Sequence, residues 1–236
     1  LLKFHGKTHG LFRRADHVIA INDLIGDYAT RYNPSVTVIP NFIDTETFVP
    51  ATAPPPPEPV RLVWIGSHTT APNLEMIGPA LARLQDDRDV VLCAVGAGDM
   101  SVPGVKVEAR PWSAESELAD LHSGHVGLVP LNDLPWNRWK FFFKTVQYMA
   151  VGLPVVARRM GSNAEVIEDG VNGFLVETQD EWYERLRLLV DDPDLRRRMG
   201  HAARRTVVER YSADVHLPRV LSVFERLVSS PSRPRP

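Results

Sequence analysis

The chain has 236 residues, of which 44% are apolar and 24% are charged, and its formal net charge is −2. These values are ordinary for a globular protein with one large domain, or with one domain and part of another. Such a small net charge gives no overall attraction to nucleic acid, and no apolar run approaches the length that spans a bilayer. We therefore expect no nucleic-acid partner and at most peripheral contact with a membrane.

The only cysteine, Cys93, lies inside the apolar run 90–95. A lone cysteine cannot form an internal disulfide, and in such a run it is most simply a small core residue. This favours a reducing, cytoplasmic setting. The first residues mix Lys, His and Arg with apolar side chains, which is not the pattern of a signal peptide. Because the first residue is Leu1 rather than Met, we expect further sequence upstream.

Before residue 50 the pattern predicts a strand at 16–21, a helix at 23–32 and a second strand at 36–39. Consecutive prolines follow within 53–59. Prolines in a row fit neither a helix interior nor a central strand, and they favour an extended backbone. We therefore predict a stiff linker over residues 46–59.

From residue 60 onward, apolar strand-like runs alternate with helical stretches. The predicted strands are 60–65, 90–95, 105–107, 126–131, 154–157 and 174–176, and the predicted helices between them are 73–84, 113–122, 144–151 and 164–169. Repeated strand–helix–strand units form a parallel sheet with helices on both faces. The predicted fold class is therefore α/β, with a Rossmann-like parallel sheet. Helices at 180–190, 194–209 and 216–228 should close the domain, ahead of a disordered tail at 229–236.

Ligands of such sheets bind outside the carboxyl ends of the strands. The first loop at that edge contains Gly66, Ser67, Thr69 and Thr70, just ahead of a predicted helix. Loop amides and a helix N-terminus suit an anion. The alternative is that Thr69 or Thr70 only turns the chain, or that Asn73 caps the helix.

The second loop, Gly96-Ala-Gly98, resembles the opening of a dinucleotide-binding fingerprint. The pattern fails at Ser101, where the third glycine is due, and Pro103 and Gly104 leave no room for the helix that should follow. This loop therefore does not predict a nicotinamide cofactor, and we expect no cofactor at all.

The third loop region, residues 136–154, is the richest in functional groups. Counting back from the helix stop at Gly152, Lys140, Lys144 and Gln147 share one helical face. Two ammonium groups and an amide near a helix N-terminus could neutralise a diphosphate and bind a sugar hydroxyl. The alternative is a solvated lysine face. A further loop, around Gly161, offers more backbone amides.

Metal ligands are not predicted. The pairs Asp87/Asp89 and Asp192/Asp194 match an Asp-x-Asp motif by letter, but the first precedes a strand at the wrong edge of the sheet and the second caps a helix. The histidines have no ligand-like spacing apart from 122 and 125, which lack acidic or thiol partners.

Several runs together resemble the donor-binding domain of glycosyltransferase family 4, the retaining enzymes of the GT-B fold. These runs are 147–156 (QYMAVGLPVV), Gly161, Glu165 and 169–175 (DGVNGFL), supported by 15–20, 38–44, 63–66, 129–131 and 195–200. The resemblance covers nearly the whole chain from residue 15 to residue 211. It implies two Rossmann-like domains, the first for the acceptor and the second for a nucleotide-activated sugar.

The chain departs from the common family pattern at two positions, because Trp139 and Gln147 stand where many members carry a pair of glutamates. A lysine-bearing branch of the family is more similar, and Lys140, Lys144 and Gln147 match it. The resemblance assigns Lys140 and Lys144 to the diphosphate, helped by amides near Gly66 and Gly161, and Gln147 to the ribose. Ser67, Thr69 and Thr70 replace the usual Arg and Lys after the first strand. Base contacts are expected from the loop that contains Arg110.

The implied activity is transfer of a sugar, with retention of configuration, from a UDP-, GDP- or ADP-linked donor to a glycan, lipid or small-molecule acceptor. The expected organisation is the end of a truncated N-terminal acceptor domain (1–45), the linker (46–59), the donor-binding domain (60–212), a crossover helix (213–228) and the tail (229–236). The chain alone should bind a donor and turn over nothing. A non-catalytic nucleotide-sugar-binding or scaffold module remains the alternative, and a sugar-nucleotide epimerase is a third hypothesis.

Overall fold

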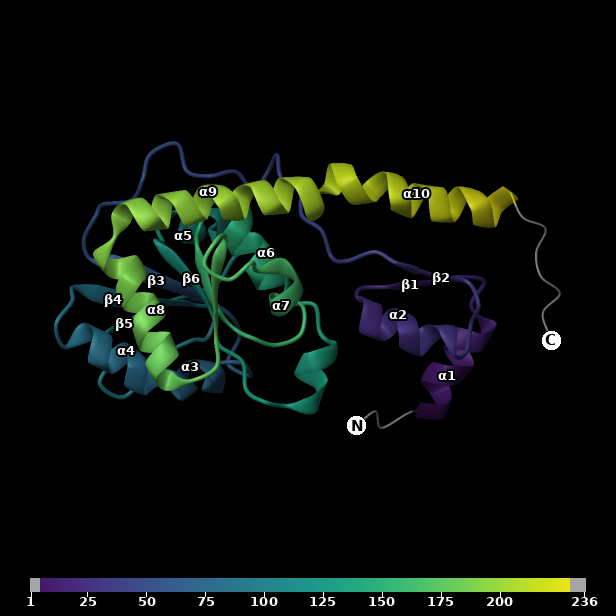
Figure 1. Cartoon of the computed structure of the whole chain (residues 1–236). Coiled ribbons are helices and arrows are strands. Elements are labelled where there is room, and N and C mark those ends of the chain that lie inside the picture. The colour runs from purple at the N-terminus through teal and green to yellow at the C-terminus, as the bar shows by residue number, and fades with distance from the viewer. Residues whose placement is uncertain (1–4, 230–236) are drawn as a thin grey trace.

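A computed structural model describes residues 5–229, which form a large sheet unit and a smaller N-terminal unit beside it (Figure 1). The smaller unit comprises α1 (His5–Arg14), β1 (Val18–Ala20), α2 (Asp23–Thr30) and β2 (Val36–Val38). The sheet unit contains the strands β3 (Val60–Ile65), β4 (Val90–Val95), β5 (Val107–Arg110), β6 (Val126–Val129), β7 (Val155–Arg158) and β8 (Gly173–Val176). Its helices are α3 (Pro72–Met76), α4 (Gly78–Gln85), α5 (Glu117–His122), the 3₁₀ helix η1 (Pro135–Trp139), α6 (Phe143–Ala150), α7 (Asn163–Val166), α8 (Gln179–Asp191) and α9 (Pro193–Arg210), after which α10 (Ala213–Ser229) ends the described chain.

The six strands of the large unit are all parallel, in the order β5-β4-β3-β6-β7-β8. The chain starts at the central strand β3, moves outward to β5, and then returns to the other side of β3 at β6. The strand order therefore reverses between β3 and β6, which is where ligand crevices form in such sheets. The predicted α/β fold with a Rossmann-like parallel sheet is confirmed.

The pairing register opens this crevice. Strand β3 pairs with β4 along its whole length, from Val60 opposite Val90 to Ile65 opposite Val95. It pairs with β6 only at Leu62 and Val63. The carboxyl ends of β3 and β6 therefore separate, and polar loops can enter between them.

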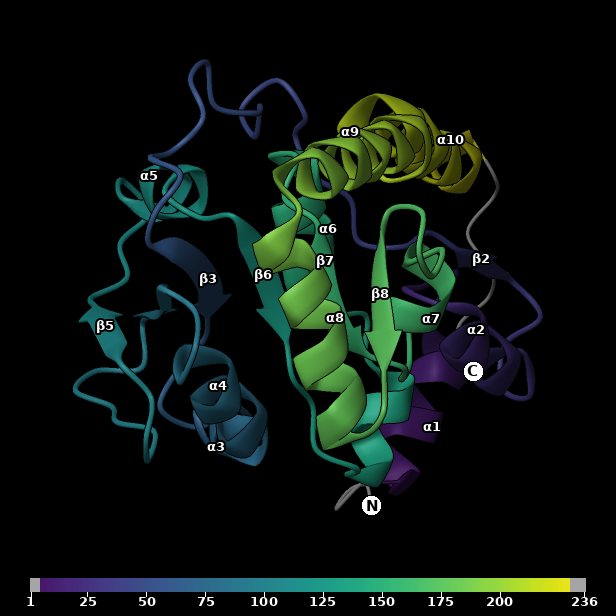
Figure 2. The same cartoon turned by 60° about the vertical axis from the view of Figure 1, so that its left-hand side comes forward.

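Both faces of the sheet are covered, because successive strand residues point to opposite sides. One face packs on α3, α4 and α8, and Figure 2 shows α8 in front of the strands. The other face packs on α5, α6 and α9. Val63 and Cys93 are buried on the α6 side, whereas Leu62 and Leu92 are buried on the α4 side. Cys93 is therefore a core residue, as expected.

Several predicted boundaries were wrong; the predicted helix 113–122 begins only at Glu117, and the predicted strand 126–131 ends at Val129. The predicted helix 73–84 is two helices, α3 and α4, that break at Ile77 ahead of Gly78 and Pro79. The predicted strand 105–107 lies instead at Val107–Arg110, because the chain first makes a tight turn around Gly104, which has a φ of 73°. The predicted helix 164–169 is only the short α7.

The N-terminal unit is held by the last helix. Strands β1 and β2 pair in parallel, and α10 runs from the end of α9 across to them (Figure 1). The Arg219 guanidinium donates to the Val38 carbonyl over 2.8 Å, and the His216 ring stacks on Phe42 with centroids 5.6 Å apart. Of the predicted disordered tail, Ser229 is the last residue of α10 and the rest lies outside the described residues.

The segment after β2 is fastened to the sheet unit by Arg204 of α9. Its guanidinium donates to three carbonyl oxygens, those of Thr45, Phe48 and Ala150, over 2.6 to 2.8 Å. The last of these is an otherwise unsatisfied carbonyl at the end of α6, where a positive charge is favourable. Arg204 thus caps α6 and fixes the start of the predicted linker.

The linker side of the sheet contains a buried histidine that makes stability depend on pH. His125 precedes β6, and its Nδ1 accepts a hydrogen bond from the Arg61 backbone amide over 3.0 Å. Burial, followed by the nearby charge of Arg196, lowers the pKa of His125 to about 4. The unfolded chain takes up a proton near pH 6.5, and the folded chain does not until about pH 4. The stability contributed by neutral His125 is therefore lost as pH falls through this window.

We expect the free energy of unfolding to fall by about 2 kcal/mol between pH 7 and pH 4.5 on account of this residue, after allowance for partial solvent screening. Urea denaturation of His125→Asn should show a shallower pH dependence, because the side chain of Asn can accept the Arg61 hydrogen bond without titrating. The exposed His68→Asn is the matched control. If the free energy of unfolding depends equally on pH in His125→Asn and in the unmodified chain, titration of His125 is not the cause of the pH dependence.

Candidate functional site

A cavity of about 340 Å³ lies at the point where the strand order reverses. Its walls come from the ends of β3 and β6, from the loop that follows β3, and from the segment that leads into α6. Its polar lining residues are Gly66, Ser67, Thr70, Asn73, Asn137, Lys140 and Lys144. A larger cavity, of about 580 Å³, lies at the opposite edge of the sheet, between the proline-rich linker and α9. We take the smaller one as the candidate site, because ligands of parallel sheets bind at the carboxyl edge.

The loop after β3 forms one wall and is held in a tight turn. The Ser67 amide donates to the Thr70 hydroxyl, and this hydroxyl donates back to the Ser67 carbonyl, each over 3.0 Å. The hydroxyl oxygens of Ser67 and Thr69 are 2.8 Å apart. Thr70 therefore does turn the chain, as the simpler interpretation predicted. The same turn leaves the amides of His68 and Thr69 without an acceptor among residues 5–229.

Asn73 does not cap a helix. It lies inside α3, it is buried, and its side-chain oxygen accepts a hydrogen bond from the Asn132 amide over 3.1 Å. This contact ties the loop after β3 to the loop after β6 and so fixes the width of the cavity.

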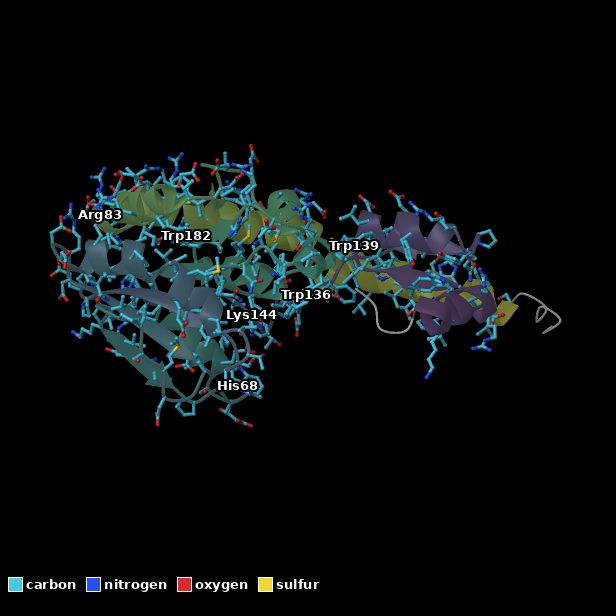
Figure 3. All side chains as sticks on the ribbon, turned by 90° about the horizontal axis from the view of Figure 1, so that it is seen from below. His68, Arg83, Trp136, Trp139, Lys144 and Trp182 are labelled. Atoms are coloured by element: carbon cyan, nitrogen blue, oxygen red, sulfur yellow. The ribbon has the colours of Figure 1, made fainter. Side chains whose placement is uncertain are left out.

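Lys144 lies in the first turn of α6 and lines the cavity. Its Nζ is 3.3 Å from Oε1 of Glu117 on α5, and its side chain is 39% exposed. One of its three ammonium protons is therefore engaged, and the other two can reach a bound anion. Figure 3 labels Lys144 together with His68 of the facing loop.

Lys140 lines the same cavity but does not lie on the helix, which corrects the prediction that it shares a helical face with Lys144 and Gln147. Helix α6 begins only at Phe143, and Lys140 has extended backbone angles (φ −81°, ψ 148°). The reason is a long-range contact: the Phe142 amide donates to the Ser162 hydroxyl over 2.7 Å instead of to a carbonyl one helical turn earlier. The Lys140 side chain lies near Trp136, with Nζ 6.0 Å from the ring centroid.

Gln147 is buried in the second turn of α6 and is 4% exposed. It is not among the lining residues of the cavity. Its Oε1 is the only buried side-chain nitrogen or oxygen atom of the described chain without a hydrogen-bond partner. A buried acceptor in this state costs about 1–3 kcal/mol relative to a satisfied one.

Gly161 lines a neighbouring cavity of about 490 Å³ together with Arg158 and Glu165, and not the first one. It has a φ of 53°, and a side chain there would collide with the carbonyl oxygens of Asn137 and Lys140 and with the ring of Phe142. Gly161 therefore lets the segment that contains Lys140 lie close against the loop after β7. Burial, and then the charge of Asp23, raise the pKa of Glu165.

Arg110 is not brought into the cavity. Its guanidinium pairs with Asp120 at 3.0 Å and with Glu108 at 3.2 Å, and Glu108 also pairs with Arg61 at 2.6 Å. These contacts hold β5 to β3 and to α5. Hydrogen bonding to Asp120 raises the pKa of Arg110.

Trp139, which occupies a family glutamate position, contacts the N-terminal unit. Its carbonyl accepts a hydrogen bond from the Asn22 side chain over 2.8 Å, and its ring meets Tyr28 edge-on at 6.1 Å. Figure 3 shows Trp136 and Trp139 on the side of the sheet unit that faces the N-terminal unit. The segment that carries Lys140 is therefore anchored to both units.

Within residues 5–229 we find no cluster of three or more His, Cys, Asp or Glu side chains in a metal-binding arrangement. Asp192 caps α9 by accepting from the Leu195 amide, as predicted. In the same part of the chain, no helix has the length and apolar character needed to cross a membrane.

The sequence interpretation missed Glu117 and Trp112. The Glu117 carboxylate engages Lys144, and it also accepts a hydrogen bond from the Trp112 indole over 3.1 Å. The available signal was a carboxylate in the first turn of the helix that follows β5, at the ligand edge of the sheet.

Comparisons with known proteins agree with this arrangement. Residues 143–206, which begin with α6 and end in α9, match the family described as "Glycosyl transferases group 1". The alpha-maltose-1-phosphate synthase of Mycobacterium tuberculosis is 28% identical over 90% of this chain and 64% of its own length. The D-inositol 3-phosphate glycosyltransferase of Thermobifida fusca is 28% identical over 80% of this chain and 50% of its own length. The chain thus spans between half and two thirds of these relatives.

Among solved structures, HepE (Alr3699) of Anabaena in complex with UDP-glucose superimposes with a TM-score of 0.76 over 93% of this chain and 66% of that one, at 16% sequence identity. At this identity the similarity establishes the fold. The resemblance inferred from the sequence is therefore confirmed: residues 143–206 match the glycosyl transferases of group 1, and the sheet unit has the Rossmann-like fold of the GT-B C-terminal half.

Proposed function

We propose that this chain is the donor-binding half of a retaining glycosyltransferase, which transfers a hexosyl group from a nucleotide sugar to an acceptor. One observation carries the proposal. Lys140 and Lys144 line the same cavity as the loop of Ser67 and Thr70, at the reversal point of the sheet. Positive charge and unused amide hydrogens gather there, as a diphosphate requires.

The chemistry is mainly electrostatic. Transfer breaks the bond between the sugar and a nucleoside diphosphate, and negative charge develops on the departing phosphate. In the proposed complex, Lys140 and Lys144 neutralise that charge from one side, and the amides of His68 and Thr69 donate from the other. The proposed site needs neither a metal ion nor a cofactor. Arg110 is left out of it, because its guanidinium is committed to Asp120 and Glu108.

The organisation of the chain forms part of the proposal. Residues 60–212 would be the donor-binding domain and 213–228 a crossover helix, whereas 1–45 would be the end of an acceptor-binding domain joined by the linker 46–59. HepE was solved with UDP-glucose, which supports a nucleotide-sugar donor here. Since the chain spans 64% of the maltose-1-phosphate synthase, we propose that it binds a donor without turnover and that the acceptor needs a further domain.

Isothermal titration of this chain with UDP-, GDP- and ADP-linked sugars tests the proposal. We expect binding of at least one donor, with an affinity that weakens as salt rises because the contacts are ionic. If none of the three releases heat or shifts the melting temperature, this cavity is not a donor site.

Gln147 provides a second test, because its buried Oε1 has no partner. We propose that the side chain rotates toward the cavity when the donor binds, and that Oε1 then accepts a hydrogen bond from a hydroxyl of the donor ribose. Gln147→Met should then raise the stability of the empty chain by about 1 kcal/mol, since it removes an unsatisfied acceptor at similar volume, and should weaken donor binding about tenfold. Thermal unfolding with and without nucleotide measures both effects. A variant that loses stability and keeps its affinity would contradict this role.

A non-catalytic module is the second candidate, and one observation favours it. Trp139 stands at a position where many family members carry a glutamate, and instead it joins the N-terminal unit through a backbone hydrogen bond with Asn22 and a ring contact with Tyr28. The two candidates differ in the full-length protein. If sugar transfer persists in the double variant Lys140→Ala, Lys144→Ala, our site assignment is wrong. If the unmodified full-length protein binds a donor and transfers no sugar, the module is the better description.

A further inference from the structure

The amide of Ile65, at the end of β3, points toward the place where the crevice opens. Successive amides of a strand point to opposite sides, and the next one, that of Gly66, donates to a carbonyl of β4 over 2.9 Å. The Ile65 amide therefore points toward β6. Pairing with β6 ends at Val63 opposite Gly127. The Ile65 amide donates instead to the hydroxyl of Tyr148, on α6, over 2.8 Å, so a side chain replaces the backbone ladder at this point.

Tyr148 fits here because β6 carries no side chain beneath its ring. The tyrosine is fully buried, and a Cβ built at Gly127 would lie 2.5 Å from Cγ and 2.6 Å from Cδ2 of the ring. In a close-packed core such distances exclude a larger residue at Gly127 while the tyrosine is present. Burial raises the pKa of the Tyr148 hydroxyl, which therefore stays neutral and accepts the hydrogen bond. The ring is thus held along its side by β6 and at its tip by the end of β3.

Helix α6 connects this contact to the ammonium group of the candidate site. Lys144 precedes Tyr148 by four residues, so both side chains lie on one face of the helix. Ile65 and Gly66 line the same cavity as Lys144, whereas Tyr148 is not among the lining residues. The hydrogen bond from Ile65 to Tyr148 therefore ties the loop that offers backbone amides to the helix that offers the cation.

We infer that Tyr148 is a positioning residue of the donor site, and that its hydroxyl sets the distance between the loop after β3 and Lys144. This inference rests on the proposed function, since it concerns the same diphosphate site. The loop amides and the ammonium group must reach one diphosphate together, and binding is strongest when they are held at the matching separation before the ligand arrives. Tyr148 provides this preorganisation without touching the ligand.

Titration of UDP and inorganic pyrophosphate into the unmodified chain, Tyr148→Phe, Lys144→Ala and the double variant tests the inference. Tyr148→Phe keeps the ring over Gly127 and removes only the hydroxyl. It should weaken both ligands about tenfold, because they share the diphosphate. In the Lys144→Ala background the same change should cost about twofold or less, because the ammonium group that the hydroxyl positions is gone. Tyr183→Phe is the matched control, since it removes a hydroxyl from a buried tyrosine of α8 on the other face of the sheet.

The outcomes are distinct. If no nucleotide binds the unmodified chain, the proposed function fails. If Tyr148→Phe binds both ligands as the unmodified chain does, the inference is overturned and the donor site remains. An equal loss of affinity with and without Lys144 would also overturn it, since Tyr148 would then only support the fold. The same holds if Tyr183→Phe loses as much affinity as Tyr148→Phe.

A measurement on the unmodified chain keeps the inference testable even if Tyr148→Phe does not fold. Hydrogen exchange of the Ile65 amide should be as slow as that of the neighbouring β3 amides, because the bond to Tyr148 protects it. Exchange as fast as in an exposed loop would mean that Tyr148 does not hold the end of β3.

Discussion

Replacement of Lys144 by alanine is expected to weaken nucleotide binding 10- to 100-fold. The ammonium group lies in the first turn of α6, where it lines the cavity at the reversal point of the sheet. A charge-assisted hydrogen bond to a phosphate contributes about 1.5–3 kcal/mol, which corresponds to this range of affinity. The change also leaves the Glu117 carboxylate without its cation, and its negative charge then repels the diphosphate. Isothermal titration with UDP and UDP-glucose measures the loss.

Lys106→Ala is the matched control, because Lys106 is an exposed lysine that precedes β5, at the other edge of the sheet. It should bind nucleotides as the unmodified chain does. Adding Lys140→Ala to Lys144→Ala should abolish detectable binding, since both cations of the cavity are then gone. Equal affinities in Lys144→Ala and Lys106→Ala would show that the diphosphate does not bind here.

Gly200→Ala is expected to be the most destabilising single methyl addition in the chain. Gly200 lies in α9 where this helix crosses the end of α6, and a Cβ there would overlap the Gly152 carbonyl oxygen and lie 3.1 Å from its carbon. Gly152 cannot yield, because it turns the chain with a φ of 79° and its amide is bonded to the Met149 carbonyl. We expect a loss of about 2–4 kcal/mol, which is larger than the gain of about 1 kcal/mol from the helix propensity of alanine.

Thermal unfolding should therefore show a fall in Tm of about 10 °C for a protein of this size. Gly10→Ala is the matched control, because it makes the same change within α1 where the nearest atom is a flexible arginine nitrogen at 3.8 Å. It should leave the Tm unchanged or raise it. A Tm of Gly200→Ala at or above that of the unmodified chain would mean that α9 and α6 are not in this close contact.

Local sequence patterns predicted the sheet well. Strands β3 and β4 begin and end where they were expected, because buried parallel strands are continuous apolar runs. The start of α9 was also predicted, because Asp192 and Pro193 form a cap and a first turn within the local sequence. Such signals require no knowledge of distant residues.

The site was predicted less completely, because its geometry depends on long-range contacts. Helical spacing predicted that Lys140 lies on α6. Instead, the Phe142 amide donates to the hydroxyl of Ser162, twenty residues further along the chain, and the helix begins only at Phe143. Arg110 was expected to contact a base, and its partners on β5 and α5 engage it instead. Periodicity identifies residues that share a face, whereas it does not reveal which charges are already neutralised.

Helix α10 has a consequence for the order in which the chain folds during synthesis. Val38 of strand β2 is synthesised 181 residues before Arg219, the α10 residue that donates a hydrogen bond to it. The sheet unit lies between them and can form as soon as β8 and α9 are complete. The contacts between α10 and the small N-terminal unit therefore form only after the sheet unit has been synthesised.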